Sequence, residues 1–177
     1  MYLREKLKVK EYFYPFAEKL NPILYDTILH IPDQSGNTDY VIKSQQAVRW
    51  IKKDDLNNQN HQLTLLENWI SQIVQRDFSL GQRSPMICFE MWGILYEDET
   101  EIEIHRHPDA CYSASYYVNA PKGSAPLIFK ESNHKIKAEE GKLIVFDGRL
   151  NHYVPKSKKV KDKKRCVIVC NFRRKYS

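Results

Sequence analysis

The first half of the chain carries apolar residues at helical spacing. Over residues 60–78 they form one stripe with polar residues between them, which predicts an amphipathic helix. The stripe consists of Leu63, Leu66, Trp69, Ile70, Ile73 and Val74. A second helix is predicted within Phe16–Ile31, beginning near Pro22 with Asn21 as its N-cap, because proline is favoured at the first helical position. A turn-rich loop is expected over Pro32–Asp39.

After Gly81 the pattern changes to short apolar or alternating runs bounded by turn residues, which predict strands. The predicted strands are Met86–Tyr96, Ile102–Ile104, Tyr112–Asn119, Leu127–Phe129, Lys142–Phe146 and Arg165–Phe172. Many short strands at close spacing favour a β-sandwich or barrel. We therefore expect a single domain over residues 1–177, with a mostly helical buttress over 1–80 and a β core over 81–177.

Composition is that of an ordinary globular protein. The chain has 177 residues, of which 42% are hydrophobic and 28% charged, and this length can bury a substantial core. No apolar run approaches the ~20 residues of a membrane span. The charged N-terminal residues also lack the apolar segment of a signal peptide. The four cysteines form no CxxC pair, which predicts free thiols in a cytoplasmic protein.

Much of the net charge of +6 is concentrated in one lysine-rich run, Lys156–Lys164. The plain interpretation is a solvated connector between two strands. The alternative is a surface that binds an anionic partner, nucleic acid included, by releasing counterions.

Three histidines have the spacing of a metal-binding set. His105 and His107 lie two residues apart on a predicted strand, so their imidazoles point to the same side. His152 follows the predicted strand that ends at Phe146 and supplies a third donor from a distant part of the chain. Three ligands on one side of a metal leave positions open for a substrate and O2, as in non-haem iron oxygenases. On the residues alone, the histidine pair could equally be the wet face of an edge strand, and imidazole does not distinguish Fe, Zn, Cu and Ni.

A cation is predicted at the start of the last strand. Arg165 shares a strand face with Val167 and Val169, and therefore stands at the edge of an apolar wall. A buried arginine needs a carboxylate or phosphate partner, and the local strand contains no acidic residue. A dicarboxylate ligand would supply that partner.

The order of these motifs resembles the 2-oxoglutarate/Fe(II)-dependent dioxygenases, and among them the small prolyl-hydroxylase-like oxygenases of bacteria and phages. The segments that carry the resemblance are Trp92–Tyr96, His105–Pro108, Ser113–Asn119, Gly141–His152, Arg165 and the terminal Asn171–Phe172. Together they cover roughly residues 86–172. The resemblance implies a cupin-like double-stranded β-helix, or jelly roll, with helices buttressing one sheet. It also implies Fe(II) as cofactor, with 2-oxoglutarate and O2 as co-substrates.

The resemblance further implies roles for individual residues. His105 matches the first iron ligand of the family and His152 the distal one. Arg165 matches the arginine that pairs with the far carboxylate of 2-oxoglutarate. Tyr117 and Tyr96 match, the latter with a one-residue shift, tyrosines that contact the co-substrate.

The sequence departs from the family at the second ligand. The family pattern is HxD, whereas His107 occupies this position here. Because His107-Pro108-Asp109 is itself an HxD, two ligand sets are open: His105/His107/His152 and His107/Asp109/His152. The first is favoured because the small group commonly carries HxHP.

Three functions follow as hypotheses. The first is an oxygenase that hydroxylates a peptide or protein, prolyl residues included, or another substrate. The second is a cupin-like three-histidine metalloprotein that does not use 2-oxoglutarate. The third is a module without enzymatic activity that binds nucleic acid or another anionic partner through Lys156–Lys164. Arg165 favours the first hypothesis, because a cupin-like metalloprotein has no need of a cation at that position.

Overall fold

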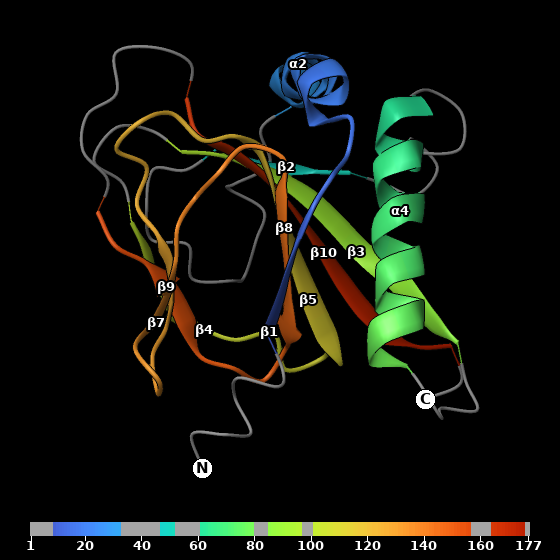
Figure 1. Ribbon diagram of the computed structural model, residues 1–177, viewed down its shortest axis with the longest axis vertical. Coiled ribbons are helices and arrows are strands. Elements are labelled where there is room, and N and C mark those ends of the chain that lie inside the picture. Colours follow the sequence, from blue (N-terminus) through green and yellow to red (C-terminus); the bar gives the residue numbers. More distant parts are fainter. Residues whose placement is uncertain are drawn as a thin grey trace.

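The computed structural model describes residues 9–32, 47–51, 61–79, 85–96, 101–156 and 164–175, with the backbone alone described for 47–50. Helices α2 (Ala17–His30) and α4 (His61–Phe78) accompany two antiparallel sheets (Figure 1). The strands are β1 (Val9–Phe13), β2 (Ala47–Trp50), β3 (Met86–Leu95), β4 (Ile102–His105), β5 (Tyr112–Asn119), β6 (Leu127–Phe129), β7 (His134–Ile136), β8 (Lys142–Asp147), β9 (His152–Val154) and β10 (Cys166–Arg174).

The strands from β3 to β10 pass back and forth between the two sheets. The larger sheet has six strands in the order β1-β8-β5-β10-β3-β2, and the smaller has four in the order β4-β9-β6-β7. Consecutive strands therefore alternate between the sheets, except β6 and β7, which pair within the smaller one. This order is that of a jelly roll, in which two sheets enclose a common interior.

The larger sheet is apolar on both faces. Figure 1 shows α2 and α4 on one side of it and the smaller sheet on the other. The helices pack on side chains such as Leu95 and Ile168, whereas Phe146 and Val167 face the smaller sheet. Because successive residues of a strand point to opposite faces, a sheet covered on both sides needs nearly continuous apolar strands. This requirement explains the apolar runs that predicted β3, β8 and β10.

The predicted helix over residues 60–78 is confirmed as α4, and the predicted strands are confirmed as β3, β4, β5, β6, β8 and β10. The sequence did not predict β1, β2, β7 or β9. Two of these, β1 and β2, come from the first 80 residues and form the two edges of the larger sheet.

The predicted start of the first helix is wrong. Helix α2 begins at Ala17 and contains Pro22 within it, where the missing N–H leaves the carbonyl of Glu18 without its usual intrahelical partner. Asn21 caps nothing and is instead buried. Its side chain accepts a hydrogen bond of 2.7 Å from the Tyr116 hydroxyl and donates one of 3.4 Å to Glu140. These contacts with the β core hold the first turn in place despite the proline.

The expectation of free thiols is confirmed for all four cysteines, and Cys166 and Cys170 are buried in the core as their shared strand face predicts. Neither helix in the described part of the chain is sufficiently long and apolar to cross a membrane. Most of the predicted loop Pro32–Asp39 and the interior of Lys156–Lys164 lie outside the described residues.

Candidate metal centre

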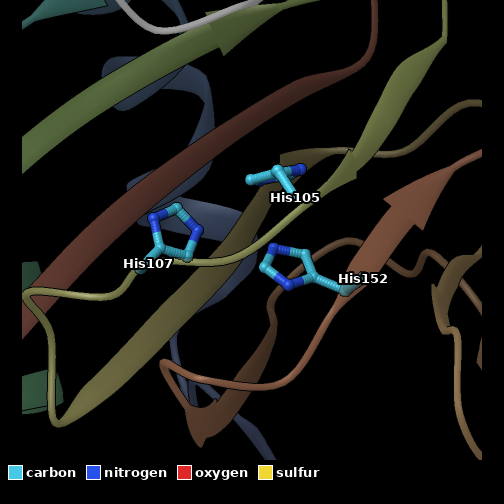
Figure 2. Close-up of side chains that lie close together, drawn as sticks. All are labelled: His105, His107 and His152. Carbon is cyan, nitrogen blue, oxygen red and sulfur yellow. The ribbon is translucent and has the colours of Figure 1, made fainter.

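Three histidines from two segments of the chain meet between the two sheets. His105 ends β4 and His152 begins β9, and the two are register partners on these paired strands. His107 lies just beyond β4, and Figure 2 shows the three rings facing a common point. One potential ligand atom from each residue lies within 4.8 Å of those of the others. The structure thus brings together the three predicted ligands, of which His152 is buried and the other two are half-buried.

Backbone carbonyls orient two of the rings. The Nδ1 atom of His105 donates to the carbonyl of Glu103 at 2.9 Å, and that of His152 donates to the carbonyl of Leu150 at 2.9 Å. Because a carbonyl can only accept, Nδ1 carries the proton in both rings and the Nε2 lone pair stays available. Metal-binding histidines are commonly held in this way through their second ring nitrogen.

The third ring contacts a side chain rather than a carbonyl. Nδ1 of His107 lies 3.4 Å from the Nδ2 atom of Asn171, which also leaves the Nε2 side of this ring toward the other two histidines. The Asn171 amide also donates to Glu90 at 2.9 Å. Asn171 and Glu90 therefore belong to the surroundings of the cluster, although the sequence interpretation did not assign either of them to it.

Burial keeps all three imidazoles neutral. It lowers the pKa of His105, and together with the neighbouring His105 it lowers the pKa of His107 to about 3. The pKa of His152 is held well below its ordinary value by burial and by the other two rings. Neutral imidazole is the form that binds a metal, so the cluster is ready to coordinate at neutral pH.

We expect the metal-free protein to lose stability as the pH falls from about 6.5 toward 5. The unfolded histidines take up protons in this range and the folded ones do not, so the free energy of unfolding decreases as the pH decreases. Thermal unfolding of chelator-treated protein would show the effect, and the pH dependence should be weaker in His152→Gln. Carboxylates with a lowered pKa, such as Asp77 beside Arg76, change the free energy of unfolding only at lower pH. An identical pH dependence in the parent and in His152→Gln would contradict the prediction.

The donor set fits a divalent transition metal. Imidazole nitrogens suit Fe, Zn, Cu and Ni. Within the described residues, the cluster includes His105 and not Asp109. Asp109 is exposed, in a turn beyond His107. The geometry therefore favours the all-histidine set, in which the ligands leave both positive charges of the metal uncompensated.

A glycine positions the segment that carries His107. The backbone N–H of His107 donates to the Gly148 carbonyl at 2.7 Å, and the Gly148 N–H donates to Cys111 at 3.2 Å. A Cβ atom at Gly148 would collide with the Ala110 carbonyl oxygen and lie 2.8 Å from the carbonyl oxygen of His107. The absence of a side chain at Gly148 therefore allows this segment to pack against the end of β8.

Gly148→Ala should push that segment outward and weaken metal binding by at least about tenfold, as is typical when support of a ligand is lost. Titration with Co(II), followed by its visible absorption, measures the effect. Gly123→Ala is a suitable control, because Gly123 has a φ of 96°, at which a side chain is strained, but has open space around it in another turn. Gly123→Ala should lower the stability of the protein and leave its affinity for Co(II) unchanged. Equal Co(II) affinity in Gly148→Ala and the parent would contradict the proposed packing role.

Arg165 lies at the other end of the same interior and is only 5% exposed. Its guanidinium carbon lies 4.2 Å from the ring centroid of Tyr96 and 5.2 Å from that of Tyr117. Nη1 donates to the carbonyl of Ala125 at 2.8 Å, whereas Nε is buried without a partner. In the described part of the chain, no carboxylate forms an ion pair with Arg165. The guanidinium therefore fits an anionic ligand.

Both tyrosines remain protonated beside this cation. Burial raises the pKa of Tyr96 to about 12 and also raises the pKa of Tyr117, and the nearby Arg165 offsets this only in part. Their hydroxyl groups can thus donate hydrogen bonds to a carboxylate.

A single cavity of about 400 Å³ connects the histidines with Arg165. All six residues predicted for the site line it, and these are His105, His107, His152, Arg165, Tyr96 and Tyr117. Their roles as metal ligands and co-substrate contacts stay predictions. Glu90, Trp92 and Asn171 line the cavity as well and were not predicted for the site, although Trp92 and Asn171 lie in segments that carry the family resemblance.

The chain is similar in structure to several oxygenases. It matches the viral collagen prolyl hydroxylase of Paramecium bursaria Chlorella virus-1, solved as a 2-oxoglutarate complex, with a TM-score of 0.70 and 11% identity over 93% of this chain and 95% of that one. A Pseudomonas putida prolyl-4-hydroxylase gives a TM-score of 0.70 and 18% identity over 95% and 93%. HygX from Streptomyces hygroscopicus, with nickel and 2-oxoglutarate bound, gives 0.65 and 8% over 93% and 82%.

No protein-family model matches the sequence, and no curated protein matches it. At these low identities the structural likeness shows the fold, and it confirms the expected double-stranded β-helix with N-terminal helices.

Proposed function

We propose that the protein is a 2-oxoglutarate- and Fe(II)-dependent oxygenase that hydroxylates an organic substrate. The observation that carries the proposal is the buried guanidinium of Arg165, which has an unpartnered Nε and shares one cavity with the three-histidine cluster. A three-histidine metalloprotein that does not use 2-oxoglutarate would leave this cation unexplained. The likeness to enzymes solved with 2-oxoglutarate supports the same choice.

The proposal assigns a role to the residues at each end of the cavity. His105, His107 and His152 would hold the metal, each through one ring nitrogen. Arg165 pairs with the distal carboxylate of 2-oxoglutarate, with the hydroxyls of Tyr96 and Tyr117 beside it. When bound, iron and 2-oxoglutarate together supply the activation of O2 that C–H hydroxylation requires.

The apolar side chains between these ends exclude water and fix the orientation of the co-substrate. Ile94 and Val167 are buried and lie opposite each other on β3 and β10 in the cavity wall. The carboxylate of 2-oxoglutarate at the metal end would balance one of the two charges that three neutral histidines leave on the metal. This charge would take the place of the carboxylate ligand that is usual for the family.

Anaerobic addition of Fe(II) and then 2-oxoglutarate to the metal-free protein tests the proposal. A metal–2-oxoglutarate chelate gives a visible charge-transfer band, which should appear only when both components are present and should be absent when Zn(II) replaces Fe(II). Binding of Fe(II) without any 2-oxoglutarate-dependent band would contradict the proposal and favour the cupin-like metalloprotein.

For the substrate, we propose only a chemical class. Two of the similar structures are named as prolyl hydroxylases, which supports a peptide or protein substrate, prolyl residues included. An anionic partner for Lys156–Lys164, nucleic acid included, stays a prediction because most of that run lies outside the described residues. Salt-dependent binding of an oligonucleotide, unaffected by a chelator, would support that role independently of the oxygenase.

A further inference from the structure

The inner face of the larger sheet has two polar ends of opposite charge. Opposite residues on β10 and β3 form successive rows, and Val167 with Ile94 and Val169 with Trp92 make the middle of the face apolar. Arg165 precedes these rows, and the pair Asn171 and Glu90 follows them. Six residues of extended strand separate Arg165 from Asn171 by about 20 Å, so the arginine and the glutamate cannot pair with each other.

Glu90 is the acidic counterpart of Arg165. It is half-buried and lines the cavity, and its carboxylate accepts a hydrogen bond of 2.9 Å from Nδ2 of Asn171. Among the residues that the structure describes, no cation forms an ion pair with it. Arg106 also lines the cavity but is exposed and does not pair with Glu90. A half-buried carboxylate in the wall of a cavity, with no cation paired to it, can bind a cationic group of a ligand.

Asn171 gives a second, independent indication of a missing donor. It is 4% exposed and lines the cavity, and its Oδ1 atom has no hydrogen-bond partner. The amide orientation is determined by Glu90, because a carboxylate accepts only and must face Nδ2. A buried acceptor without a donor is costly, so this end of the cavity lacks N–H groups as well as positive charge.

Asp109 adds a further acceptor on the same side. It is exposed and lines the cavity. The segment that carries it is joined to this end of β10 by the hydrogen bond of 2.8 Å from the Cys111 N–H to the Phe172 carbonyl. The histidine cluster lies close by, because His107 contacts Asn171.

We infer that the primary substrate carries a cationic nitrogen, an ammonium or a guanidinium, which Glu90 binds at the end of the cavity opposite Arg165. Such a group supplies both the charge and the N–H donors that this end lacks, and the indole of Trp92 can lie along its alkyl stem. The inference rests on the proposed function, which assigns the Arg165 end to 2-oxoglutarate. Basic amino acids and basic side chains of peptides share this chemistry.

The test compares three probes of equal length: pentylammonium, pentan-1-ol and pentanoate. Zn(II)-loaded protein, which does not turn over, is titrated with each probe by ligand-observed NMR, with and without saturating 2-oxoglutarate. We expect pentylammonium to bind at least about tenfold more tightly than pentan-1-ol, and pentanoate to bind no better than the alcohol when 2-oxoglutarate is present. Glu90→Gln should remove the preference for the ammonium without changing the affinity for the alcohol.

Glu18→Gln is the matched control. It removes the same charge at an exposed position on α2, on the opposite face of the larger sheet, and should retain the preference. Equal affinities of the unmodified protein for the ammonium and the alcohol would overturn the inference, and this result does not depend on the folding of any variant. A preference that survives Glu90→Gln would also overturn it. The 2-oxoglutarate affinity, measured in the same samples, separately decides the proposed function.

Discussion

Arg165→Lys is expected to raise the apparent dissociation constant for 2-oxoglutarate well over tenfold while the metal stays bound. The guanidinium can form a bidentate pair with a carboxylate, and the lysine ammonium cannot reproduce that geometry. The arginine is also held in place by the Ala125 carbonyl and by stacking on Tyr96, neither of which a flexible lysine would retain in the same form. Loss of a partly buried charge pair of this kind costs about 2–5 kcal/mol of binding free energy.

The measurement is an anaerobic 2-oxoglutarate titration of the Fe(II) protein, followed by visible absorption. Arg173→Lys is a matched control, because Arg173 lies on β10, the strand that Arg165 immediately precedes, and its guanidinium carbon lies 4.7 Å from the ring centroid of Phe89. Arg173 is exposed, and the control should bind 2-oxoglutarate as the parent does. An unchanged affinity in Arg165→Lys would remove the main support for the oxygenase.

The elements that the sequence predicted correctly are those that form their pattern locally. Helix α4 carries a complete apolar stripe over 18 residues, and β3, β8 and β10 are long apolar runs because both faces of their sheet are covered. In such segments, the side chains that a strand or helix must bury are all present in one continuous stretch of sequence. The helix shows its period directly, and the strands show an apolar run.

The missed strands are short and depend on their neighbours. Strands β7 and β9 have three residues each and include polar ones, whereas β6, which is equally short, is entirely apolar and was predicted for that reason. Strand β9 forms because it pairs with β4 on one side and β6 on the other, and no local propensity reveals such pairing. The same reason applies to Pro22, which is accepted inside α2 because Asn21 bonds to Tyr116 from a distant part of the chain.

The residues of the candidate site also fall into two groups, those that sequence motifs reveal and those that only the pairing of strands reveals. The histidines and Arg165 could be proposed because they occur in spaced motifs, and the structure places them in one cavity. Glu90 and Asn171 could not, because each is a single polar residue in an apolar strand. Their relation appears only when β3 and β10 pair and bring residues 81 positions apart into hydrogen-bond contact.

Removing one histidine of the cluster should abolish tight metal binding, and the choice of histidine decides the ligand set. His107→Ala should weaken binding under either set and therefore does not discriminate. His105→Ala should lower the affinity for Fe(II) or Co(II) on the order of a hundredfold, because one of three bonds to the metal is lost. Asp109→Ala should leave the affinity near that of the parent, because Asp109 is exposed and lies outside the cluster.

Isothermal titration of chelator-treated protein with Co(II) gives both affinity and stoichiometry, and we expect one metal per chain in the parent and in Asp109→Ala. Circular dichroism verifies that each variant is folded, which matters most for His152→Ala because His152 is buried between the sheets. The Co(II) spectrum separates the loss of a ligand from a purely structural effect of the substitution, because its bands report the number and type of ligands. If Asp109→Ala abolishes metal binding while His105→Ala preserves it, the ligands are His107, Asp109 and His152, and the metal would then carry the carboxylate that is usual for the fold.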